Sequence, residues 1–224
     1  MSAREHILRR VREGLAAHPA DDLRRARVEE RMRTHRRGTT PARAKGEQTA
    51  ICALFVAMAK EADASVDVVR AIDVPETIAA FLRARNLGTD VRMGTDPFLT
   101  GLAWERAPEL TVSHGPADAL TATGITGAVA AAAETGTVIL ASGADNPTTL
   151  NFLPETHIAI VPASAIGATY EDAWERLRGA RPETEMPRVI NFVTGPSRTA
   201  DIEQTLLMGA HGPRRLHVIV VEDA

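Results

Sequence analysis

Cysteine is almost absent from this chain, because Cys52 is the only one among 224 residues. A single thiol excludes a disulfide framework within the chain. It also excludes an iron–sulfur cluster held by this chain alone, which needs about four thiolates. The scarcity of cysteine favours a cytoplasmic location. A chain of this length can bury a substantial apolar core without such covalent links.

Long apolar runs and the common nucleotide-binding motifs are also missing. No stretch reaches the roughly 20 residues of a membrane span, and the charged N-terminus is unlike a signal peptide. There is no glycine-rich dinucleotide fingerprint, no P-loop and no nucleophile elbow. These absences argue against a nicotinamide dehydrogenase, an ordinary ATPase and an α/β-hydrolase.

Charge is distributed unevenly along the chain. Residues 1–45 hold 13 Arg and Lys against 6 Asp and Glu, whereas the remainder holds 13 against 23. A basic arm on an acidic body can bind nucleic acid or an acidic partner. The arm has no aromatic residue to stack on bases, and glutamates are interleaved with its arginines. We therefore expect solvated helix faces here and no nucleic-acid binding.

The hydrophobic pattern divides the chain into two parts. Helices are predicted over 3–17 and 21–36, and a linker follows at 37–46. This pattern predicts an Arg-rich helical arm over 1–45 and an α/β domain over 46–224.

From residue 47, helical and strand patterns alternate. Predicted helices cover 51–62, 75–86 and 169–178, and predicted strands cover 66–69, 90–93, 109–112, 138–140, 157–161, 189–193 and 217–221. Several of these strands are apolar throughout, which suits a sheet that is covered on both faces. The sequence therefore predicts an α/β fold with a mostly parallel central sheet flanked by helices.

The segment 124–137 fits two structures. Its alanine-rich part has high helix propensity, but a hairpin with Glu134, Thr135 and Gly136 at its tip fits as well, and we favour the hairpin. A glutamate at such a turn, followed by Thr137 in a buried strand, can serve as a nucleophile or general base. It can equally be a turn residue in solvent.

The segment 194–203 is the most informative one. It follows the apolar run 189–193 and precedes a helical pattern over 202–208, so we expect a strand-to-helix turn. Backbone N–H groups at the start of a helix bind anions, and an arginine beside them adds a permanent positive charge. An ordinary capped turn is the plainer interpretation. The candidate ligand-binding residues of this turn are Gly195, Pro196, Ser197, Arg198, Thr199 and Asp201.

His211 and Gly212 follow this predicted helix, for which Gly209 is the expected C-cap. His211 can donate to a bound carboxylate or act as a base, or it can be satisfied by nearby carbonyl groups. His157 opens a predicted strand, and we expect it to be structural. No histidine pair has a recognised zinc spacing, so no metal site is expected.

Several of these segments together resemble the lactate utilization protein C family, whose domain is called LUD. The resemblance covers about residues 50–224. It rests on Ala133–Thr137, Leu153–Pro154 with His157–Ile158, the run 194–203, and the run 209–213 with the closing apolar strand. The matched positions are Glu134, Thr135, Gly136, Gly195, Ser197, Thr199, Asp201, His211 and Gly212.

The resemblance implies a fold like that of the ribose-phosphate isomerase and CoA-transferase group. It also implies a role in bacterial L-lactate oxidation to pyruvate, together with two iron–sulfur partner proteins. The redox clusters would then lie in those partners, in agreement with the single Cys52. On this hypothesis a small carboxylate or phosphate binds at 195–199 beside Arg198, Glu134 faces the same pocket as a base, and His211 completes its rim.

Two other functions fit the same sequence. By analogy with the CoA-transferase fold, Glu134 can form an acyl intermediate in a free-standing acyl or CoA transferase. Alternatively, the chain is a non-catalytic scaffold whose basic arm docks on an acidic partner.

Overall fold

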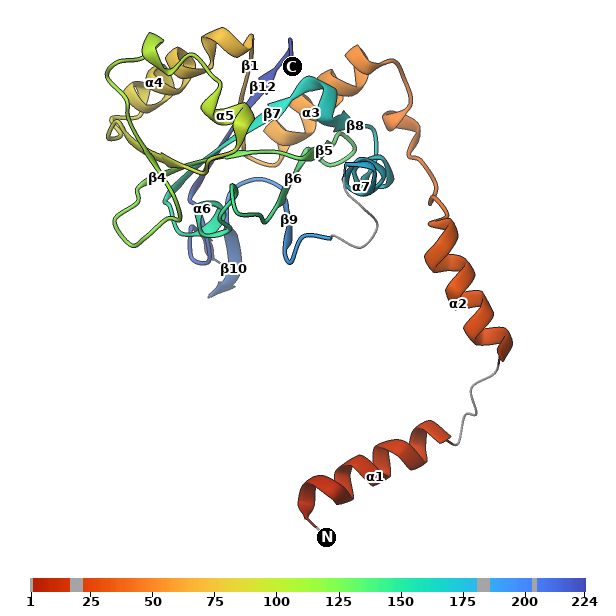
Figure 1. The fold of residues 1–224 in the computed structure, drawn as a ribbon. Coiled ribbons are helices and arrows are strands. Elements are labelled where there is room, and N and C mark those ends of the chain that lie inside the picture. Colours follow the sequence, from red (N-terminus) through yellow and green to blue (C-terminus); the bar gives the residue numbers. More distant parts are fainter. Residues whose placement is uncertain (1, 17–21, 181–185, 203–204) are drawn as a thin grey trace. The chain divides into compact units, whose positions relative to one another are not determined.

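The computed structural model describes residues 2–16, 22–180, 186–202 and 205–224 (Figure 1). Contacts within the chain divide it into two compact units, Met1–Thr39 and Thr40–Ala224.

The smaller unit contains two helices, α1 (Ala3–Ala16) and α2 (Asp22–Thr34). They confirm the two helices predicted for this region, to within two residues at each end. The large apolar side chains of α1 are all exposed, namely Ile7, Leu8, Val11 and Leu15.

The larger unit is built on a six-stranded sheet in which every neighbouring pair is parallel, in the order β1-β12-β7-β4-β2-β3. This arrangement confirms the predicted mostly parallel central sheet. The strands are β1 (Ser65–Val69), β2 (Asp90–Met93), β3 (Thr111–His114), β4 (Thr123–Gly127), β7 (Thr156–Pro162) and β12 (Arg215–Val221).

The two faces of this sheet pack against different layers, because successive side chains of a strand point to opposite faces. On one face, Ile158, Ile160 and Ile219 pack against α4 (Val74–Ala84). On the other face, the alternate residues of β7 and β12 pack against α3 (Gln48–Glu61) and a second sheet. Since both faces are covered, these strands are apolar almost throughout.

The second sheet has the order β8-β5-β6-β9. Its strands are β5 (Ala130–Ala132), β6 (Thr137–Ala141), β8 (Ile166–Gly167) and β9 (Ile190–Val193). Strands β5 and β6 are antiparallel, with Ala132 opposite Thr137, which confirms the hairpin expected around Glu134. The outer face of this sheet packs on α7 (Tyr170–Gly179), which lies on the opposite side of the body from α4 (Figure 1).

Strand β4 was not among the predicted strands. Its sequence contains two glycines, which weaken a strand pattern. A β-carbon at Gly124 would lie 2.7 Å from the carbonyl oxygen of Leu150 in the short helix α6 (Thr149–Phe152). The glycine therefore allows α6 to lie directly on the sheet. A second short helix, α5 (Pro97–Thr100), follows β2.

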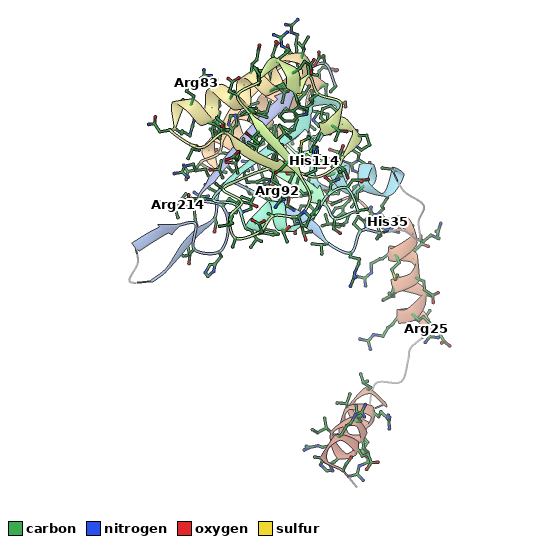
Figure 2. All side chains as sticks on the ribbon, turned by 60° about the vertical axis from the view of Figure 1, so that its left-hand side comes forward. Arg25, His35, Arg83, Arg92, His114 and Arg214 are labelled. Atoms are coloured by element: carbon green, nitrogen blue, oxygen red, sulfur yellow. The ribbon has the colours of Figure 1, made fainter. Side chains whose placement is uncertain are left out.

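The helix predicted over 202–208 is wrong. Strands β10 (Arg198–Ile202) and β11 (Thr205–Met208) form an antiparallel hairpin here, which is a two-stranded sheet of its own. The segment is too short for its apolar residues to distinguish a helix from a strand, and Thr199, Ile202 and Thr205 are β-branched. Gly209 is consequently not a helix C-cap; it follows β11 with a φ of 80°. Arg214 packs over Gly209, at the base of this hairpin (Figure 2).

Among the described residues, no helix is both long enough and apolar enough to cross a bilayer.

Candidate functional site

A cavity of about 220 Å³ lies at the end of the body where β7 and β12 begin. In Figure 1 this is the end where α6, β9 and β10 lie, away from the C-terminus. The cavity is lined by Asn151, Phe152, His157, Phe192, Val193, Thr194, Gly195, Pro196, Ser197, His211, Gly212, Pro213 and Leu216. The first four residues of the 194–203 segment and the loop at residue 211 therefore line the same cavity.

Main-chain hydrogen bonds hold these two segments together. The N–H of Ser197 donates to the carbonyl of Pro213 at 2.8 Å, and the N–H of Gly209 donates to the carbonyl of Ser197 at 2.8 Å. The N–H of His211 lies 3.4 Å from Ser197 Oγ. Gly212 packs against Ser197, because a β-carbon added at Gly212 would lie 3.4 Å from Ser197 Cβ. The backbone thus fixes Ser197 against the loop that carries His211.

Gly195 joins this turn to the rest of the body. Its φ is 72°, which side chains disfavour, and a β-carbon here would clash with the carbonyl oxygen of Ala62, just after α3. Both the backbone angle and this close approach require glycine. The residue therefore sets the path of the chain from β9 into the wall of the cavity.

His157 forms the buried part of the wall. Its side chain is 1% exposed, and its Nε2 lies 2.7 Å from Thr126 Oγ1. Its Nδ1 is buried without a hydrogen-bond partner. Burial lowers the pKa of His157 to about 4, so the ring is neutral near pH 7. The residue that we expected to be structural is therefore part of the candidate site.

The lining has no Asp, Glu, Lys or Arg side chain. Its polar residues are Asn151, His157, Thr194, Ser197 and His211. Apolar side chains make up much of the rest, including two partly exposed phenylalanines. Such a wall, with few polar groups among apolar ones, is typical of a small-molecule site. Within the part of the chain that the structure describes, no cluster of three His, Cys, Asp or Glu could hold a metal ion.

A group of hydroxyls lies behind Thr194. The buried Thr137 Oγ1 lies 2.7 Å from Thr194 Oγ1, 2.7 Å from Thr135 Oγ1 and 2.8 Å from the Tyr170 hydroxyl. One hydroxyl can donate once and accept twice, so these three contacts satisfy Thr137 completely. The predicted residues Thr135 and Thr137 therefore support the cavity wall without lining it.

Glu134 is placed differently from our expectation. Its Oε1 accepts a hydrogen bond of 2.9 Å from the N–H of Tyr170, the first residue of α7. Gly136, with a φ of 65°, packs the hairpin tip closely on Ala59 of α3. Glu134 is not among the residues that line the cavity. It caps a helix N-terminus, where a negative charge is stabilising.

Arg198 also points elsewhere. Its Nη1 lies 2.6 Å from Asp63 Oδ2, and Arg198 is not among the lining residues. Thr199 pairs with Leu207 in the β10–β11 hairpin, and the side chain of Asp201 lies outside the described residues. Because no helix begins here, the expected anion site at a helix N-terminus is not formed. Of the predicted residues, Gly195, Pro196, Ser197, His211 and Gly212 line one cavity.

Eight lining residues were not predicted to bind a ligand, and four of them are Asn151, Phe152, His157 and Thr194. The sequence held one signal for His157, which is a polar residue at the start of an otherwise apolar strand. The other three of these four gave no comparable signal.

Comparison with known proteins relates the chain to proteins of lactate utilization. Lactate utilization protein C of Anoxybacillus flavithermus is 43% identical over 91 residues, which are 41% of this chain and 40% of that protein. Lactate utilization protein C of Bacillus subtilis is 42% identical over 101 residues, 45% of this chain and 42% of that protein. The matched segments thus span less than half the length of these relatives.

A solved structure has a similar fold. A DUF162 family protein from Deinococcus radiodurans superposes with a TM-score of 0.55 and 26% identity, covering 80% of this chain and all of that one. The profile of the LUD domain matches residues 33–221. The chain therefore belongs to the LUD domain family.

Proposed function

We propose that this chain is a component of an L-lactate utilization system that works with iron–sulfur partner proteins, and that its cavity binds a small carboxylate. The relatives named lactate utilization protein C support a role in lactate utilization, and the iron–sulfur partners are part of the proposal. One observation carries the second part: the polar residues Asn151, Thr194, Ser197 and His211 line one cavity that has no acidic side chain in its lining.

The chemistry of these groups suits a carboxylate. Hydroxyl, amide and imidazole groups can each donate a hydrogen bond to a carboxylate oxygen, and such charge-assisted bonds are stronger than neutral ones. An acidic side chain would repel the ligand, and the lining has none. The apolar remainder of the wall suits the methyl group of lactate. In this proposal the chain binds and orients the acid, and the partner proteins supply the redox centres.

A free-standing acyl or CoA transferase has less support. That reaction needs the Glu134 carboxylate free to attack, whereas this carboxylate accepts the N–H of Tyr170 and lies outside the cavity. Incubation with acyl-CoA followed by intact-mass measurement tests this alternative, since an adduct on Glu134 would revive it.

The test of the proposed function uses Ser197→Ala. We expect lactate-dependent activity of the assembled system to fall at least tenfold. Folding should be nearly unchanged, since only the long contact from the His211 N–H to Ser197 Oγ is lost. The matched control is Ser113→Ala on β3, outside the cavity, which should keep full activity. Full activity of Ser197→Ala would show that the proposed site is wrong.

The partner part has a separate test. The tagged chain is isolated from lactate-grown cells, and its co-purifying proteins are identified by mass spectrometry. Two cysteine-rich iron–sulfur proteins are expected. Recovery of the chain alone would contradict the proposed assembly. It would leave carboxylate binding open, which calorimetric titration of the isolated chain with L-lactate tests separately.

A further inference from the structure

The cavity has a buried polar atom that nothing in the described structure satisfies. His157 Nδ1 has no hydrogen-bond partner, whereas Nε2 on the other side of the ring lies 2.7 Å from Thr126 Oγ1. An unpaired buried polar atom is destabilising, and natural proteins contain few of them. His157 is one of the residues that line the cavity, and a ligand that shifts the wall enough to uncover this buried atom can supply the missing partner.

The lining residues differ in burial and therefore in their suitability for a charged group. His157 and Asn151 are buried, 1% and 6% exposed, whereas His211 is exposed and Ser197 is half-buried. An ionised carboxylate costs far more to bury than a hydroxyl or carbonyl oxygen. A neutral imidazole does not balance a negative charge, and burial keeps the ring of His157 neutral near pH 7. The carboxylate of a ligand therefore belongs near Ser197 and His211, and a neutral oxygen belongs near His157.

We propose that His157 recognises the oxygen on carbon 2 of a 2-hydroxy or 2-oxo carboxylate through a hydrogen bond at Nδ1. The inference rests on the proposed function, because it presumes that the cavity binds a small carboxylate.

Thr126 lets one site accept both kinds of oxygen. When the Thr126 hydroxyl donates to Nε2, the proton of the neutral ring is on Nδ1, which can donate to a 2-oxo group. When Thr126 accepts from Nε2–H, Nδ1 is an acceptor for a 2-hydroxy group. The hydroxyl rotates between these arrangements, so the ring can follow the ligand by a change of tautomer.

Calorimetric titration of the full chain with L-lactate, pyruvate and propionate tests this inference. Propionate keeps the carboxylate and the carbon chain but lacks an oxygen on carbon 2. We expect L-lactate and pyruvate to bind at least tenfold more tightly than propionate, because propionate leaves His157 Nδ1 unpaired.

The variant His157→Phe keeps a ring but removes both nitrogen atoms. It should bind propionate about as well as the unaltered chain does, and it should lose its preference for the two oxygenated acids. His217→Phe is the matched control, because His217 is also a buried histidine of the same sheet but lies on the face that packs against α4. That control should keep the tenfold preference.

The outcomes separate the two proposals. If all three acids bind equally to the unaltered chain, or if His157→Phe keeps the preference, the role of His157 is overturned and carboxylate binding stands. If none of the acids binds, carboxylate binding fails and this inference fails with it. Should His157→Phe not fold, nitrogen NMR of the unaltered chain decides: L-lactate must shift the Nδ1 signal of His157 and propionate must not.

Discussion

Thr137 is the centre of the hydroxyl group that supports the cavity wall. Its side chain is fully buried, and three hydroxyls lie within 2.8 Å of its Oγ1. Through Thr194 this group reaches the candidate cavity, and through Tyr170 it reaches α7. A buried polar network of this kind is stabilising only while all its members are satisfied.

Thr137→Val should therefore destabilise the fold. Valine has a similar shape but leaves Thr194 and Tyr170 without a shared partner, so we expect a loss of about 1–3 kcal/mol in the free energy of unfolding. Urea denaturation measures this loss. The control is Thr111→Val at an exposed strand position, which should change the free energy by less than about 0.5 kcal/mol. Equal stability of the two variants would contradict the role of Thr137.

The two buried histidines make stability depend on pH. Burial lowers the pKa of both His157 and His217 to about 4, and for His217 the nearby Asp67 opposes this shift only partly. The unfolded chain therefore binds more protons than the folded chain between about pH 6.5 and 4. The stability from these two residues is complete above pH 6.5 and decreases as the pH falls through that range.

Urea denaturation at several pH values checks this dependence with His217→Phe. That variant should lose less stability than the unaltered chain between pH 6.5 and 4, because one of the two buried groups is gone. The control is His114→Phe at the exposed end of β3 (Figure 2), which should keep the original dependence. An unchanged dependence in His217→Phe would contradict the prediction.

At the scale of elements, the turn between β9 and β10 positions the site. Gly195→Ala would combine an unfavourable backbone angle with a clash against the Ala62 carbonyl. We expect a loss of at least about 2 kcal/mol in the free energy of unfolding, and weaker ligand binding because Pro196 and Ser197 would be displaced.

Gly143→Ala is the control for this variant, because a β-carbon at Gly143 meets no atom within 4 Å. It should change stability by less than about 1 kcal/mol. Urea denaturation and calorimetric titration with L-lactate measure both effects. If Gly195→Ala were as stable as Gly143→Ala, the close approach to Ala62 would not control this turn.

At the scale of the whole molecule, the three clusters of buried apolar side chains all lie in the larger unit, Thr40–Ala224. Their members lie between residue 51 and the C-terminus, whereas α1 leaves its large apolar side chains exposed. An isolated helix of 14 residues is only marginally stable in water. The stability of residues 40–224 therefore should not depend on the arm.

Deletion of residues 1–39 tests this independence. The remaining body should keep its cooperative thermal unfolding, with a Tm within about 4 °C of that of the full chain, because its core is unchanged. Circular dichroism measures the unfolding. A body that no longer unfolds cooperatively would contradict the prediction. Comparison of co-purified proteins for both chains would show whether the basic arm contributes to partner binding.

The sequence by itself determined the elements whose signals are local. His157 and His217 are each followed by four consecutive apolar residues, which is a strand signal that depends only on local sequence. The turn residues around Glu134 favoured a hairpin over a helix, which the structure confirms, and the family followed from short motifs. These features depend on neighbours in the chain, which the sequence shows directly.

Only the tertiary structure decided which residues share the cavity. Ser197, His157 and Asn151 come from separate segments and meet because of the strand order and the backbone bonds around Ser197. The same long-range contacts place Glu134 on α7 and Arg198 on Asp63, away from the cavity. Between 198 and 208 the apolar residues fitted helix and strand alike, and pairing of the two halves decided the structure. The physical reason is that packing and hydrogen bonding between distant segments outweigh local propensity where the local signal is weak.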